Sequence, residues 1–132
     1  MSRSTLWVGR VLSALPVALM VFSAILKFRA PPEVLQTFTA KYGYPPQSLA
    51  IIGVLELACV VVYVVPQTAV LGAVLIAAYL GGAVSTHVRA SEAWFMPVLT
   101  AVVAWLGLYL REPRLRELLP LRRPGGTVSS PS

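Results

Sequence analysis

Glu56 stands alone among apolar residues, because no other charged side chain occurs in the seventeen-residue segment 49–65. A segment of that length is close to the minimum that crosses the hydrocarbon core of a bilayer, which is about 30 Å thick. A carboxylate at that depth is costly unless it is paired, protonated or turned toward a water-filled cavity. Glu56 is therefore the first candidate for a functional group, as a hydrogen-bond acceptor or as a site of proton exchange.

Four further polar residues are expected near this carboxylate. Lys27 closes the first apolar segment, and His87 and Arg89 follow the third. At a rise of about 1.5 Å per residue, Glu56 and Tyr79 lie roughly 10 Å and 9 Å below the same face of the membrane. The sequence predicts a polar pocket formed by Lys27, Glu56, Tyr79, His87 and Arg89, suited to a small ligand with a polar head and an apolar body, such as a quinone.

Structural explanations for the same residues stay open. Glu56 could form a buried pair with Lys27 or Tyr79 that only fixes helix packing. Lys27 and Arg89 could extend to the headgroups as long basic side chains do, and His87 could be an ordinary interfacial residue. A metal site is not expected, because one His, one buried carboxylate and one Cys supply too few ligands. No nucleophile–base–orienter set appears either, so a stand-alone enzyme is not expected.

The composition indicates which elements position these groups. The 132 residues are 57% hydrophobic and 12% charged, with a mean hydropathy of +0.75, whereas soluble domains carry about 25% charged residues. We predict an all-α membrane protein, a four-transmembrane-helix bundle with spans at about 11–28, 49–65, 69–86 and 94–110. The alternatives are a soluble helical bundle and a cleaved signal peptide at 11–28, which Phe22 disfavours three residues before the candidate cut.

The segments between the spans are also informative. Residues 32–41 predict a short interfacial helix between spans one and two, with Gly43 as its stop. Residues 1–112 form the expected transmembrane domain, and 113–132 are a basic, partly disordered cytoplasmic tail whose end, 124–132, is rich in Pro, Gly and Ser. Cys59 has no partner for a disulfide; it is expected to fill space on the helix face that carries Glu56.

The distribution of Lys and Arg predicts the orientation. One side of the membrane carries seven of these residues, including Arg3, Arg10 and five in or just before the tail; the other carries Lys27, Arg29, Lys41 and Arg89. Seven against four favours both termini in the cytoplasm of a multi-pass protein of the bacterial inner membrane. The net charge of +6 fits contact with anionic lipid rather than nucleic acid, because no basic stripe with interleaved aromatics occurs.

The third span carries a small residue at every fourth position, and such a row allows another helix to approach closely. Its members are Ala69, Ala73, Ala77, Gly81 and Ser85. We interpret the row as a packing face toward another span or toward a second copy of the chain.

Several short motifs together resemble the DoxX-like family of small bacterial membrane proteins. They are residues 27–28 (KF), 43–45 (GYP), 53–57 (GVLEL), 79–89 (YLGGAVSTHVR) and 108–111 (LYLR), within roughly residues 8–120. The resemblance implies a four-helix membrane bundle. Relatives named for the family include the small membrane subunit of a thiosulfate:quinone oxidoreductase, which implies a quinone-linked redox role.

Together these observations predict an accessory or membrane-anchor component of quinone-linked redox metabolism that binds a small lipophile near Glu56. Its expected partners are the lipid bilayer, an oxidoreductase subunit and further copies of the chain. No cofactor other than a quinone is suggested. The alternatives are a membrane scaffold without a ligand and, third, a small proton-coupled transporter that uses Glu56.

Overall fold

Helices form the whole of the fold in the computed structural model, which describes residues 2–122. The four long helices are α1 (Arg3–Arg29), α3 (Ser48–Val64), α4 (Ala69–Arg89) and α5 (Phe95–Arg111). The all-α class predicted from the sequence is confirmed, since no strand occurs in this part of the chain. The fifth α-helix of the described residues, α2 (Pro32–Gln36), is short and lies where the interfacial helix was predicted.

Helix α1 begins eight residues before the first predicted span. The side chain of Ser2 caps it by accepting a hydrogen bond from the backbone N–H of Thr5 at 3.1 Å, which satisfies one of the free donors of the first turn. Pro16 lies buried inside the helix without ending it. The helix ends at Ala30, whose φ of 46° is left-handed, a conformation that terminates helices.

The predicted interfacial helix lies between α1 and α3. It consists of α2 followed by a π-helical turn, η1 (Thr37–Lys41), and Gly43 has a φ of +79° just beyond it. A positive φ costs glycine little, so the chain turns there toward α3. We call residues 32–44 the lid.

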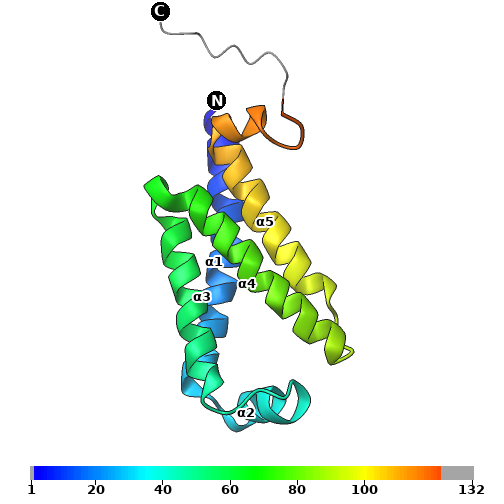
Figure 1. The fold of residues 1–132 in the computed structure, drawn as a ribbon. Coiled ribbons are helices and arrows are strands. Elements are labelled where there is room, and N and C mark those ends of the chain that lie inside the picture. The colour runs from blue at the N-terminus through cyan, green and yellow to red at the C-terminus, as the bar shows by residue number, and fades with distance from the viewer. Residues whose placement is uncertain (1, 123–132) are drawn as a thin grey trace, which may run out of the picture.

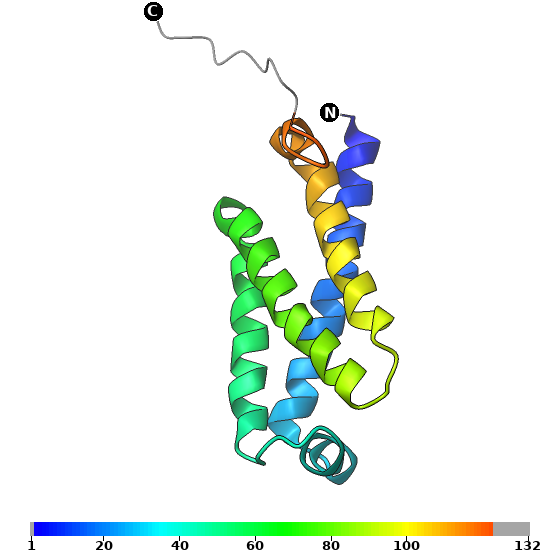
Figure 2. The same cartoon turned by 45° about the vertical axis from the view of Figure 1, so that its right-hand side comes forward.

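The long helices form a ring in which α1 contacts α3 and α5, and α4 contacts the same two helices. Figures 1 and 2 show the N-terminus, the end of α5 and the α3–α4 turn, η2 (Pro66–Thr68), at one end of the bundle. The lid and the α4–α5 loop lie at the opposite end. We call these the termini end and the lid end.

Large apolar side chains occur on the outer surface of the bundle as well as in its core. Phe22 on α1 is 61% exposed and Val54 on α3 is 58% exposed, while Ala73 and Ile76 of α4 are fully buried. Contiguous apolar surface on this scale is foreign to soluble monomers. Two helices, α1 and the continuous segment 66–89, are long and apolar enough to cross a membrane, and α3 and α5 are shorter apolar helices.

The row of small residues on α4 divides into two parts. Ala69 and Ala73 are buried against the neighbouring helices, whereas Gly81 and Ser85 are exposed. A Cβ added to Gly81 would meet no atom within 4 Å. The row is therefore an internal packing face only in its first half.

Beyond α5 the chain forms a short 3-10 helix, η3 (Pro113–Glu117), whose Leu115 is buried. The first part of the predicted tail is thus packed against the bundle. The segment 124–132, predicted to be disordered, lies outside the described residues.

Candidate functional site

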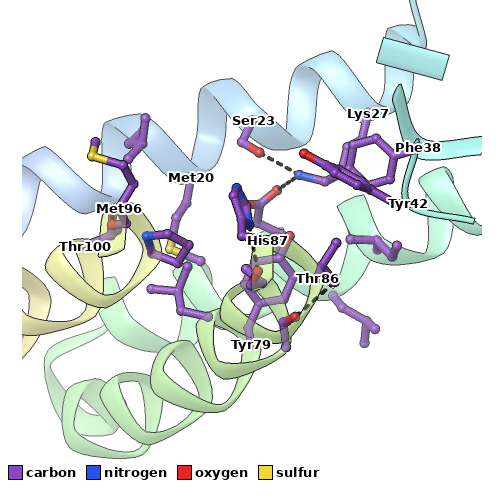
Figure 3. A pocket seen from close by; sticks show the side chains of 18 of the residues that line it. Met20, Ser23, Lys27, Phe38, Tyr42, Tyr79, Thr86, His87, Met96 and Thr100 are labelled. Carbon is purple, nitrogen blue, oxygen red and sulfur yellow. Dashed lines mark hydrogen bonds and ion pairs between the residues drawn. The ribbon is translucent and has the colours of Figure 1, made fainter. Parts of the chain in front are cut away.

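A buried ion pair joins α1 to α3 near the lid end. Lys27 Nζ lies 2.9 Å from Glu56 Oε1, and the two side chains are only 7% and 3% exposed. The ammonium also donates to Ser23 Oγ at 2.5 Å, because Ser23 precedes Lys27 by one helical turn on the same face of α1. Figure 3 shows the Ser23 hydroxyl turned toward the Lys27 ammonium. The pair expected among the structural alternatives is therefore present.

Phe38 of the lid completes the surroundings of the ammonium. Its ring centre lies 5.6 Å from Lys27 Nζ, within the range in which a cation is attracted to the face of an aromatic ring. The Lys27 ammonium therefore has three interaction partners: a hydroxyl, a carboxylate and an aromatic ring. This arrangement compensates for most of the lost hydration of the ammonium.

Helix α4 supplies the groups opposite the ion pair. Tyr79 lines the same pocket as Glu56. About two turns later, Thr86 Oγ1 lies 3.0 Å from the carbonyl oxygen of Gly82 and 2.7 Å from the Tyr44 hydroxyl of the lid. Thr86 thus connects α4 to the lid.

These residues surround a cavity of about 650 Å³. Its polar lining includes Lys27, Glu56, Tyr79, Thr86 and His87, and its apolar lining comes from all four long helices. The larger apolar members are Leu19, Met20, Ile52, Leu55, Leu80 and Met96. A cavity with mostly apolar walls and a few convergent polar groups is the usual form of a small-molecule site.

His87 and Arg89 have different positions relative to this cavity. His87 lines it, and its Nδ1 lies 2.6 Å from the carbonyl oxygen of Ala83. Arg89 is not among the lining residues; its guanidinium donates to the carbonyl oxygen of Tyr42 at 3.1 Å. Arg89 thus supports the lid from outside the cavity.

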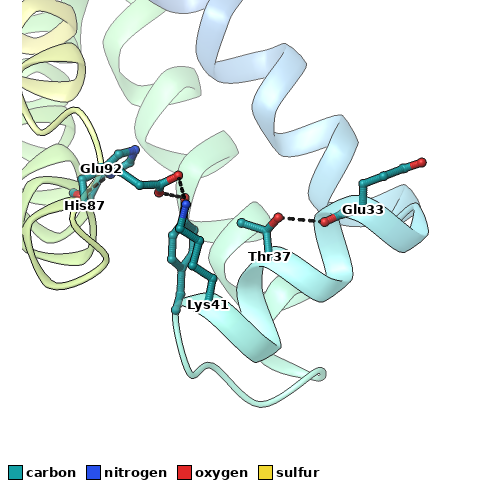
Figure 4. Close-up of polar contacts among 7 residues, drawn as sticks. Glu33, Thr37, Lys41, His87 and Glu92 are labelled. Atoms are coloured by element: carbon teal, nitrogen blue, oxygen red, sulfur yellow. Dashed lines mark hydrogen bonds and ion pairs between the residues drawn. The ribbon is translucent and has the colours of Figure 1, made fainter.

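A polar latch holds the lid against the α4–α5 loop. Glu92 of that loop accepts a hydrogen bond from the Tyr42 hydroxyl. It also forms an ion pair with Lys41, whose Nζ lies 2.8 Å from Glu92 Oε2. Figure 4 shows Lys41 and Glu92 meeting beside His87. The hydrogen bond from Lys41 lowers the pKa of the Glu92 carboxyl, and burial together with Glu92 raises the pKa of the Tyr42 hydroxyl to about 12.

Of the five residues predicted for the pocket, Lys27, Glu56, Tyr79 and His87 line one cavity, and Arg89 does not. Four lining residues outside that prediction are Ser23, Phe38, Tyr42 and Tyr44. Ser23 could have been included from its spacing to Lys27. The lid residues could not, because no local pattern shows over which helices a connecting segment folds.

A second polar cluster lies at the termini end and was not predicted. The Tyr63 hydroxyl lies 2.7 Å from the carbonyl oxygen of Ala104 and 2.8 Å from Ser13 Oγ. Arg111 Nε donates to the same Ser13 oxygen at 3.0 Å, and the Arg111 guanidinium lies 5.5 Å from the Tyr63 ring centre. Tyr63 is 1% exposed, so its hydroxyl is bonded within the protein and not to solvent.

Comparison with known proteins supports the family resemblance. The model of the DoxX-like family matches residues 11–107, which include both polar clusters except Arg111. No curated protein and no solved structure matches the chain significantly.

Proposed function

The chain belongs to the DoxX-like family of membrane proteins, and we propose that it binds a quinone-type lipophile in the cavity beside Glu56. The observation that carries this proposal is the Lys27–Glu56 ion pair at the edge of a cavity of about 650 Å³ with largely apolar walls. Such a volume lies within the range of about 300–1,000 Å³ that holds small ligands. A ring and alkyl chain would contact the apolar walls, while oxygen atoms would face Glu56, Tyr79 and His87.

We further propose that all four long helices cross the bacterial inner membrane. At about 1.5 Å per residue, the 17-residue helices α3 and α5 are about 25 Å long. That length approaches the hydrocarbon thickness of about 30 Å and requires little tilt. Both termini would face the cytoplasm, because seven of eleven Lys and Arg residues lie on that side.

The proposed role is that of an accessory or anchor component. The described residues place no nucleophile beside a general base in the cavity, so chemistry on the ligand would require a partner oxidoreductase subunit. The exposed half of the α4 row, including Gly81 and Ser85, would suit contact with such a subunit or with a second copy.

A paired substitution tests ligand binding without leaving a lone buried charge. In Lys27→Met/Glu56→Leu, both partners become apolar residues of similar size, a change that folded proteins tolerate. Binding of either member of an alkylated benzoquinone–hydroquinone couple to the protein in lipid nanodiscs should weaken at least about tenfold. Val88→Ala is the control, because Val88 is 56% exposed on the outer face of α4. Unchanged binding by the double variant would contradict the proposal.

A membrane scaffold is the second candidate, and one observation favours it. The ammonium of Lys27 already has Ser23, Glu56 and Phe38 as partners, so the pair is complete without a ligand. A scaffold predicts that neither member of the couple raises the melting temperature of the wild-type protein. A ligand site predicts a rise that grows with ligand concentration.

A further inference from the structure

Helices α3 and α4 separate between their shared turn and the lid end of the bundle. Figures 1 and 2 show the two helices diverging from η2 toward the lid. On the side of the turn, Cys59 Sγ of α3 lies 3.7 Å from the carbonyl oxygen of Leu75 of α4. At the lid end, the Tyr44 hydroxyl lies 2.7 Å from Thr86 Oγ1 of α4. At about 1.5 Å per residue, these two contacts are about 16 Å apart along α4.

The residues between these two contacts border the cavity and the outer surface at once. Leu55 of α3 and Ala78 and Gly82 of α4 line the cavity, and all three are exposed. Residues that line a cavity and are also exposed mark a place where the cavity opens to the outside. A Cβ added to Gly82 would meet no atom within 4 Å. We call the place formed by Leu55, Ala78 and Gly82 the side opening.

The other edges of the cavity carry larger groups. The lid covers one end and is held by the latch between Lys41, Tyr42 and Glu92. On α1 and α5, the exposed lining residues are Leu19 and Met96, which have long side chains. The smallest of the exposed lining residues that the structure describes are therefore those that α4 places at the side opening.

The side opening faces an apolar surface. Val54 of α3 and Val74 of α4 are 58% and 50% exposed on the outside of the bundle. Counted back from Arg89, Gly82 lies about 10 Å along α4 from its lid end. In the proposed four-span arrangement, that depth lies within the hydrocarbon core. An alkyl chain that passes through the opening exchanges one apolar environment for another, because lipid tails are as apolar as leucine.

From this geometry, and resting on the proposed function, we infer that the site takes a long-chain lipophile whose alkyl chain leaves the bundle through the side opening. The polar ring lies beside Lys27 and Glu56, and the chain extends between α3 and α4 into the bilayer. The walls of the cavity then limit the size of the ring, whereas the length of the chain is not limited. A ligand without a chain leaves the opening to an acyl chain of the surrounding lipid.

The test uses two benzoquinones with the same ring, one with a long unbranched alkyl chain and one with a methyl group. In Gly82→Leu the new side chain lies back over the preceding helical turn, toward Ala78, and narrows the side opening. Binding to the protein in lipid nanodiscs is compared with wild type for each quinone separately, so its partition into lipid cancels. We expect the long-chain quinone to bind at least about tenfold more weakly, and the methyl quinone to stay within about threefold.

Two control variants show whether the position matters. Gly81 is exposed with equally open space, yet it is not among the lining residues. Gly81→Leu gains the same helix propensity as Gly82→Leu and should keep both affinities. Met96→Phe enlarges the exposed side chain on α5 and should also keep both.

The outcomes separate this inference from the proposed function. Gly82→Leu that weakens both quinones equally, or neither, overturns the inference alone. The same holds if Met96→Phe selectively weakens the long-chain quinone, because the chain would then leave between α1 and α5. If wild type binds only the long-chain quinone, its affinity for Gly82→Leu against Gly81→Leu decides. Binding of neither quinone by wild type overturns the proposed function as well.

Discussion

The two ends of the bundle handle buried polar groups in opposite ways. At the termini end, Tyr63, Ser13, Arg111 and the carbonyl oxygen of Ala104 bond directly to one another. At the lid end, Lys27 and Glu56 also bond directly, yet they border a cavity of about 650 Å³. Both ends satisfy their polar groups, but only one keeps space beside them.

Glycine explains the close packing of the termini end. A Cβ on Gly9 would lie 2.6 Å from Arg111 Cγ and 2.8 Å from the carbonyl oxygen of Gly107. Gly72 abuts the backbone of Val62 and Tyr63. At the lid end, added Cβ atoms on Gly81 and Gly82 would meet nothing within 4 Å. The helices are therefore closely packed around the polar groups of the termini end, whereas space remains beside Gly81 and Gly82 of α4 at the lid end.

The largest expected effect comes from breaking the ion pair at the lid end. Glu56→Leu alone leaves the Lys27 ammonium buried without its carboxylate, and Lys27→Met alone leaves the carboxylate. Each single change should lower the free energy of unfolding by about 3–5 kcal/mol. Denaturant unfolding in detergent micelles measures it.

The double variant sharpens that result. Lys27→Met/Glu56→Leu should recover most of the loss, because no charge is then left unpaired. A double variant as unstable as the singles would show that the pair itself, rather than the stranded charge, stabilises the fold.

A methyl group added at a glycine should destabilise the protein at the termini end and should be tolerated at the lid end. Gly72→Ala places a methyl group 2.7 Å from the Val62 carbonyl carbon and should cost about 1–3 kcal/mol. Gly81→Ala on the same helix meets open space and should be neutral or stabilise by up to about 1 kcal/mol. Melting temperatures of the two variants give the comparison; equal losses would contradict it.

Tyr63→Phe tests the hydrogen bonds of the termini end. The variant removes the hydroxyl that lies near Ser13 and the Ala104 carbonyl, and should cost about 1–3 kcal/mol because these buried groups lose a partner. Tyr109→Phe is the control, because Tyr109 is partly buried and its hydroxyl forms no hydrogen bond within residues 2–122. Hydroquinone binding should be unchanged in both, since the cavity lies at the other end.

The smallest effect concerns the latch on the lid. Lys41 and Tyr42 lower the pKa of the Glu92 carboxyl in the folded protein. The stabilisation of the lid by ionised Glu92 is therefore fully present above the ordinary pKa of 4.5, and it is lost as the pH falls through the lower pKa of the folded state. The protection factors of the lid amides, which are corrected for the intrinsic exchange rate at each pH, should therefore fall in acid, and Glu92→Gln should lower them already at neutral pH. Exchange that depends on neither change would show that apolar contacts alone hold the lid.

Much of the architecture followed from local properties of the chain. Apolar segments interrupted by proline and glycine predicted the long helices to within a few residues, except that α1 begins at Arg3. The lone carboxylate of Glu56 called for a partner, and Lys27 was named as a possible one because it ends the first apolar segment at the same face of the membrane. Burial of Tyr63 and the Ser13 contact had no such signal in the sequence.

Tertiary structure alone decided which residues meet across helices. Depth does not specify how each helix is rotated about its axis, and that rotation brought Lys27 to Glu56 while directing Arg89 to the lid backbone. It also separated α4 into a packed half and a half with open space at Gly81. Sequence therefore determined which residues are helical and which polar groups lie within apolar helices, because both depend on neighbours along the chain. The cavity and its acceptors depend on how four helices pack together, which no single segment encodes.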